Sequence, residues 1–122
     1  MENKLKRLRQ ILARVKDLLY TQAVLGWDQQ TYMPEGGAAD RAEQLATLAE
    51  ISHNLFTSAE VGSLLEELKP YQDSLEADSD DACLIRVASR QFQKAVRVSE
   101  EWVAEHARVT AVAQSVWEKS RA

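Results

Sequence analysis

The start of the chain holds the feature that most constrains its fold, an apolar stripe at helical spacing with no helix breaker inside it. Leu5, Leu8, Leu12, Val15 and Leu19 follow one another at intervals of 3, 4, 3 and 4 residues. This spacing places their side chains on one face of an α-helix. No glycine or proline precedes Gly26, and Pro34 disfavours helical geometry at the residue before it. The sequence therefore predicts one long helix over residues 3–30.

Two further helices follow from similar patterns. Gly36 and Gly37 allow a flexible or left-handed corner, after which a second helix is predicted from Ala38 to Leu55. Its predicted packing face is made of small and apolar residues: Ala42, Leu45, Ala46, Leu48, Ala49 and Ile51. Thr57 and Glu60 have the spacing of a capping box, which predicts a short third helix that ends before Pro70.

Two more helices are expected after a polar, acidic loop over residues 70–80. Ser79 followed by two aspartates predicts the start of a fourth helix that reaches Val98. Ser99 then predicts the N-cap of a fifth, whose expected packing face is Trp102, His106, Val109, Ala113 and Val116. No segment alternates with period two, so no sheet is expected. The predicted fold class is all-α: about five helices in an antiparallel bundle of hairpins, with a long first helix.

Composition and motifs exclude several classes of function. The single cysteine, Cys83, excludes an intramolecular disulfide and any cysteine-rich zinc site. His53 and His106 are far apart, and neither belongs to a His-Glu-x-x-His helix. No nucleophile elbow or phosphate loop occurs. With no apolar leader and no spanning segment, we expect a cytoplasmic protein without membrane partners.

A cationic stripe is the one feature that suggests nucleic acid. Arg86, Arg90, Lys94 and Arg97 share one face of the predicted fourth helix. We interpret it as an outer face that pairs with residues 60–81, which hold eight carboxylates and one lysine. The net charge of −4 and the poor interleaving of aromatic residues argue against a nucleic-acid partner.

The segment between the first two predicted helices contains more distinctive side chains than a connection between helices requires. Trp27, Asp28, Thr31, Tyr32 and a Met-Pro stop fall within eight residues. In one interpretation Trp27 fills the core, while Asp28 caps a helix or pairs with Arg41. In the other, Asp28, Thr31 and Tyr32 line a cleft formed with a larger body.

This segment also carries a family resemblance. The resemblance rests on Leu25-Gly-Trp-Asp-Gln-Gln-Thr-Tyr-Met-Pro-Glu-Gly-Gly37, Arg41-Ala-Glu-Gln-Leu-Ala-Thr-Leu48, His53 and Thr57. With these residues the sequence resembles the N-terminal region of the Taq-type thermostable metallocarboxypeptidases. The likeness continues through Leu64-Leu65-Glu66 and into Trp117-Glu-Lys-Ser-Arg121. It therefore extends over nearly the whole chain.

The resemblance implies a mostly helical, cytoplasmic enzyme, often a homodimer, that removes C-terminal amino acids from peptides. In that family a divalent metal, zinc or cobalt, is held by a His-Glu-x-x-His helix and a downstream glutamate. This chain has no such motif. No catalytic residue and no metal ligand can therefore be assigned here, and no cofactor is expected in this segment itself.

We therefore expect residues 1–122 to be the N-terminal helical segment of a larger metallocarboxypeptidase, a cap over its substrate groove, with the catalytic part absent. The last residues lack a helix stop, which also suggests a longer protein. The expected partners are the remainder of the parent and its peptide substrate. Alone, the segment is expected to be inactive and to dimerise through an apolar helix face. The alternatives are a stand-alone helical interaction module and, on the cationic stripe alone, an RNA-binding protein.

Overall fold

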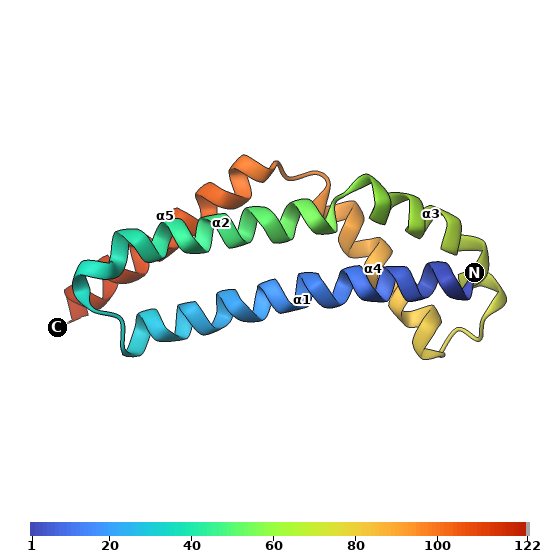
Figure 1. Ribbon diagram of the computed structural model, residues 1–122, viewed down its shortest axis with the longest axis horizontal. Helices are drawn as coiled ribbons and strands as arrows, with labels where there is room; N and C mark the ends of the chain where they lie inside the picture. The colour runs from blue at the N-terminus through green and yellow to red at the C-terminus, as the bar shows by residue number, and fades with distance from the viewer. Residues whose placement is uncertain (122) are drawn as a thin grey trace.

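The computed structural model describes residues 1–121, and these residues form only helices and the turns between them (Figure 1). The elements are α1 (Glu2–Thr31), the 3₁₀ helix η1 (Glu35–Gly37), α2 (Ala38–Phe56), α3 (Ala59–Ser74), α4 (Asp80–Ala95) and α5 (Glu100–Arg121). The all-α prediction and the long first helix are confirmed. Within this described range no helix combines the length and the apolar character needed to cross a membrane.

Three long helices give the molecule its elongated shape (Figure 1). α2 runs antiparallel to α1 and packs against both α1 and α5. α5 returns along α2 toward the end of the molecule where α1 finishes. The shorter α3 and α4 pack against each other and lie at the opposite end, where α1 begins.

The hydrophobic core lies at the end where α1 begins. Its most deeply buried side chains come from three helices: Leu8 and Ile11 of α1, Val61 and Leu68 of α3, and Ile85 of α4. Only the first part of the predicted apolar stripe of α1 is therefore buried. Leu5 and Leu8 are buried, Leu12 and Val15 are partly buried, and Leu19 is 51% exposed.

The boundaries of α3 differ from the predicted ones. Ser58, not Thr57, is the N-cap, because Ser58 has an extended backbone and its Oγ accepts a hydrogen bond from the Val61 amide. The Thr57 hydroxyl instead donates to the His53 carbonyl at the end of α2. The helix also continues through Pro70 to Ser74, so the predicted loop over residues 70–80 shrinks to residues 75–79.

The predicted N-caps of the last two helices are confirmed. Ser79 Oγ accepts from the Ala82 amide, and Ser99 Oγ accepts from the Trp102 amide. α4 stops at Ala95, three residues before its predicted end at Val98.

The predicted packing face of α5 is wrong. Trp102, His106, Val109, Ala113 and Val116 are all exposed, and among residues 100–120 of this helix only Ala104 and Ala111 are buried. These alanines face α2, which presents the buried Ala42, Ala46 and Ala49. Small side chains on both helices permit close packing, which the larger side chains of the predicted face would prevent.

The cationic stripe is an outer face, as interpreted, but the predicted pairing of its charges with residues 60–81 is wrong. Three of the eight carboxylates in residues 60–81 pair with the start of α1, through Lys4–Glu67 at 2.7 Å, Arg7–Glu60 at 2.5 Å and a close Arg9–Asp81 contact. Arg90, Lys94 and Arg97 form no ion pair with residues 1–121. The stripe is therefore an exposed cationic face.

Candidate functional site

The stretch Leu25–Gly37, here called the Trp-Asp segment, includes the last turn of α1 and is joined to the start of α2 through Arg41. One Arg41 nitrogen lies 3.0 Å from an Asp28 carboxylate oxygen, and another donates to the Leu25 carbonyl at 2.7 Å. Arg41 Nε donates to Gln44 on its own helix. The Arg41 side chain is only 15% exposed. The predicted Asp28–Arg41 pair is confirmed, and it has a structural role in closing this corner.

The aromatic residues of the segment point outward. Trp27 is 59% exposed, so the interpretation in which it fills the core is wrong. Its ring lies 5.7 Å from that of Tyr32, which is more exposed still. The hydroxyl of Thr31, also exposed, donates to the Trp27 carbonyl within the helix. Trp27 and Tyr32 therefore form an exposed aromatic pair at the end of α1.

The corner after Pro34 forms without left-handed backbone. Gly36 and Gly37 belong to η1, and neither has a positive φ angle. The left-handed corner allowed by the sequence is thus not used. A single turn of 3₁₀ helix is enough to reverse the chain, and it leads directly into α2.

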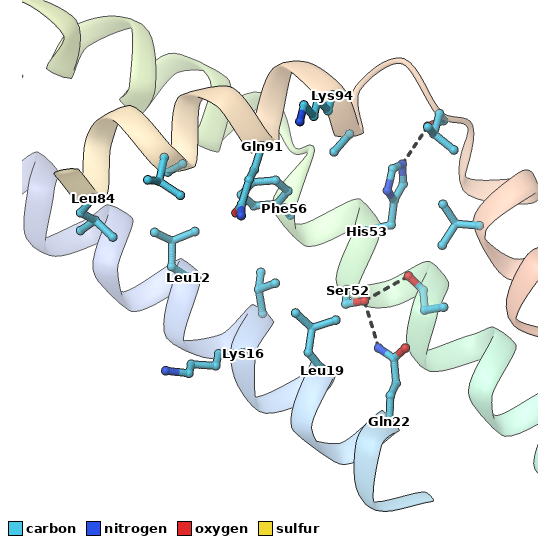
Figure 2. A pocket seen from close by; sticks show the side chains of 17 residues that line it. Leu12, Lys16, Leu19, Gln22, Ser52, His53, Phe56, Leu84, Gln91 and Lys94 are labelled. Atoms are coloured by element: carbon cyan, nitrogen blue, oxygen red, sulfur yellow. Dashed lines mark hydrogen bonds between the residues drawn. The ribbon is translucent and has the colours of Figure 1, made fainter. Parts of the chain in front are cut away.

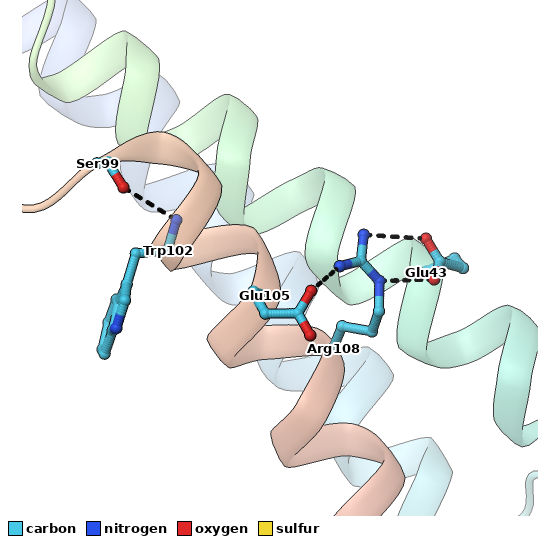
Figure 3. Close-up of polar contacts among 5 residues, drawn as sticks. All are labelled: Glu43, Ser99, Trp102, Glu105 and Arg108. Carbon is cyan, nitrogen blue, oxygen red and sulfur yellow. Dashed lines mark hydrogen bonds and ion pairs between the residues drawn. The ribbon is translucent and has the colours of Figure 1, made fainter.

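Two polar links that the sequence did not predict hold α5 in place. Gln29 of α1 is buried, and its amide nitrogen donates to the Ala111 carbonyl at 2.8 Å and to Ser115 Oγ at 3.1 Å. Arg108 of α5 binds both Glu43 of α2 and Glu105 of its own helix (Figure 3). Hydrogen bonds to these two carboxylates raise the pKa of Arg108 above its ordinary value.

A groove lies between α1, α2 and α4 (Figure 2). Its volume is about 710 Å³, and apolar side chains such as Leu12, Leu19, Phe56 and Leu84 dominate its lining. The sequence analysis did not predict this groove. The available signal was the apolar stripe of α1 continuing to Leu19, which is longer than the core that α3 and α4 cover.

The described residues do not fit a metal ion. Nowhere in residues 1–121 do three or more His, Cys, Asp or Glu side chains gather closely enough to hold one. His53 Nε2 lies 2.9 Å from the Val98 carbonyl oxygen, and the His106 ring stacks on Trp102 with centroids 4.9 Å apart. Both histidines therefore make structural contacts.

Comparison with known proteins identifies the family of this chain. The family described as Carboxypeptidase Taq (M32) metallopeptidase matches residues 7–122, nearly the whole chain. The chain belongs to this family. The resemblance drawn from the Trp-Asp segment is thereby confirmed, and the segment lies within the matched range of the M32 carboxypeptidases.

Three relatives illustrate the similarity. The thermostable carboxypeptidase 1 of Thermus thermophilus is 31% identical over 99 residues, which are 81% of this chain and 19% of that protein. The thermostable carboxypeptidase 1 of Pyrococcus furiosus is 29% identical over 118 residues, or 94% of this chain and 23% of that protein. The carboxypeptidase 1 of Bacillus subtilis is 25% identical over 116 residues, with 95% and 23% covered.

The chain thus spans about a fifth of the length of these curated relatives. No solved structure matches it.

Proposed function

We propose that this chain is the N-terminal part of a metal-dependent carboxypeptidase that releases C-terminal amino acids from peptides. The observation that carries the proposal is the family match over residues 7–122, together with relatives that are all named carboxypeptidases. The zinc or cobalt ion and its ligands would belong to the remainder of the parent, because the residues described here do not fit a metal.

The segment would act as a cap that covers the substrate groove of the parent. Large apolar side chains that are more than half exposed support a packed position against another body. They include Val24 and Trp27 on α1 and Trp102, Val109 and Val116 on α5. Soluble proteins rarely leave many such side chains bare unless they contact a partner. A cap of this kind would limit access to the groove and exclude water from it.

Activity measurements on two proteins test the proposal. The 122-residue chain and a gene-length protein would each be assayed on a blocked dipeptide with added zinc or cobalt. We expect metal-dependent release of the C-terminal amino acid from the gene-length protein alone. Turnover by the 122-residue chain would contradict the assignment of the metal site to the remainder. Absence of activity in both proteins would contradict the carboxypeptidase proposal itself.

Trp27 offers a test of the cap within the gene-length protein. Since Trp27 is mostly exposed, Trp27→Ala should leave the folding of the 122-residue chain nearly unchanged. In the gene-length protein the same change should lower kcat/KM if this corner faces the groove. Leu48→Ala on α2, which lies outside the Trp-Asp segment, is the control for a general loss of packing.

A stand-alone helical interaction module is the second candidate. The apolar groove between α1, α2 and α4 favours it, because such a groove can bind a partner helix. The reading frame after Ala122 distinguishes the two candidates. A long continuation with a His-Glu-x-x-His motif supports the enzyme, whereas an immediate stop codon supports the module.

A further inference from the structure

The groove between α1, α2 and α4 is lined mainly by apolar side chains. Leu12, Leu19, Phe56, Leu84 and Val87 are among its apolar lining residues, and they come from all three helices. Leu19 is 51% exposed and Val87 is 43% exposed, although both belong to this apolar surface. Leaving such side chains in water is unfavourable, so the groove would gain stability from an apolar occupant.

The polar groups on the α2 side of the groove are already satisfied. Gln22 donates to Ser52 Oγ at 3.3 Å, and Ser52 in turn donates to the Ala49 carbonyl at 3.1 Å. His53 bonds with the Val98 carbonyl. Figure 2 shows these contacts along the wall formed by α2. An occupant of this part of the groove therefore needs no matching hydrogen-bond groups.

The lysines that line the groove give it positive charge only. Lys16 on α1 and Lys94 on α4 lie on opposite borders, and no aspartate or glutamate is among the lining residues (Figure 2). Neither lysine forms an ion pair within residues 1–121, although Lys16 lies 5.5 Å from the Tyr20 ring centroid. Carboxylates along both edges of an occupant would complement these borders.

The shape and the backbone of the groove favour a helical occupant. An extended peptide needs backbone hydrogen-bond partners, but the walls are helices whose own backbone groups are already bonded. A helix satisfies its backbone internally. A half-embedded helix about 10 Å wide would fill the 710 Å³ with about 12 residues, or roughly three turns.

We propose that this groove binds an amphipathic helix whose apolar stripe is bordered on both edges by carboxylates. The helix would be supplied by the remainder of the parent polypeptide, and only this origin rests on the proposed function. The relatives are several times longer than this chain, so a parent of similar length would contain many candidate helices. Docking would cover Leu19 and Val87 and place carboxylates near Lys16 and Lys94.

Peptide binding to the 122-residue chain tests the chemistry of the groove. The probe is a labelled, end-blocked helical peptide of about 16 residues, with leucines at helical spacing and glutamates along both borders. A second peptide has lysines in place of the glutamates. We expect the glutamate peptide to bind about ten-fold more tightly, with a preference that weakens in salt. Equal binding of the two peptides, or no binding of either, would overturn the proposal.

Variants locate the binding site. Leu19→Glu and Val87→Glu should each weaken binding of the glutamate peptide about ten-fold or more, since each buries a charge against the apolar stripe. Val24→Glu changes an exposed apolar residue on α1 that does not line the groove, so it should bind normally. Lys16→Glu should reduce the preference for the glutamate peptide, whereas Lys6→Glu should not. Circular dichroism checks that each variant remains folded. Equal losses in the test variants and their controls would contradict binding in the groove.

Two further measurements test the origin of the occupant. The glutamate peptide should not bind the gene-length protein, because the groove is then already filled. Binding to both proteins with equal affinity would overturn the intramolecular origin, whatever the carboxypeptidase assay shows. If the 122-residue chain dimerised and Leu19→Glu made it monomeric, a second copy would be the occupant, and the proposed origin would be wrong.

Discussion

Arg41 links α1 and α2 at the corner between them. It binds the Asp28 carboxylate and the Leu25 carbonyl of α1 and also Gln44 of α2, from a position with little exposure to water. Arg41→Ala leaves two partners of α1 without their charged donor. We expect the free energy of unfolding to fall by about 1–3 kcal/mol, as measured by urea denaturation.

Two further variants make the Arg41 result specific. Arg41→Lys should recover only part of the loss, because a single ammonium group cannot replace a planar fork of donors. Arg14→Ala removes an exposed arginine of α1 that forms no ion pair within residues 1–121 and should change stability little. A loss in Arg41→Ala no larger than in Arg14→Ala would contradict the structural role.

Glu60 should make the stability of the chain depend on pH in acid. Its hydrogen bond from Arg7 lowers the pKa of the Glu60 carboxyl below the ordinary value of 4.5. The pair therefore stabilises the fold fully above pH 4.5 and loses this contribution as the pH falls through the lowered pKa. The Glu60→Gln variant should be less stable than the unsubstituted 122-residue chain at neutral pH, and this difference in stability should shrink in acid.

The Glu60 measurement is a series of urea denaturations between about pH 7 and about pH 3. Since both partners are exposed, the effect should be modest and should weaken in high salt. Glu66→Gln, which removes a carboxylate without an ion pair in the described residues, is the control. If the free energies of unfolding of Glu60→Gln and of the unsubstituted 122-residue chain differed by a constant amount across this pH range, the linkage would be ruled out.

At the level of elements, Pro70 lies inside α3 instead of after it. Proline removes a backbone donor and crowds the preceding turn, yet the helix continues for another turn. Tyr71 and Leu75, just beyond the proline, pack against the core and favour this continuation. The sequence rule for proline was therefore overridden by packing that only the folded structure provides.

Pro70→Ala should consequently stabilise the chain. The proline side chain is exposed, so little packing is lost, while the helix regains a hydrogen bond and a better helix former. We expect the free energy of unfolding to rise by about 1–2 kcal/mol, measured by urea denaturation. Gln72→Ala, on the same turn, is the control for propensity alone. A decrease in stability for Pro70→Ala would show that stiffening of the unfolded chain by proline matters more.

The elements that could be predicted are those whose signals are local. Ser79 and Ser99 were identified as N-caps because a cap involves only its own helix. The packing face of α5 could not be identified in this way, since helical spacing marks an apolar face without saying what covers it. The buried face depends on Ala104 and Ala111 meeting the alanines of α2, which is a property of two helices together.

The same distinction applies to the candidate site. The Asp28–Arg41 pair could be predicted because both residues lie close to one short connection. The groove could not, because it is formed by side chains from α1, α2 and α4, which are distant in sequence. Gln29 was missed for a similar reason, since its partners Ala111 and Ser115 lie on α5.

At the scale of the whole molecule, α5 has two different faces. Its alanine face packs on α2, while Trp102, His106, Val109, Ala113 and Val116 form an exposed seam at intervals of 4, 3, 4 and 3 residues. This is the spacing with which helices pair in coiled coils. In the parent such a seam would be covered by the remainder of the polypeptide. In the 122-residue chain, a second α5 can take that place.

We therefore expect the 122-residue chain to form a dimer through paired α5 helices at high concentration. Val109→Glu together with Val116→Glu should give a monomer, because charges on the seam oppose its burial. Both valines are mostly exposed in the single chain, so the double variant should remain folded. Val24→Glu, an equally drastic change on the exposed side of α1, should still dimerise. Light scattering over a range of concentrations measures the mass, and a monomer at every concentration would contradict the prediction. A dimer that survives the double substitution would instead show that a surface other than α5 joins the two copies.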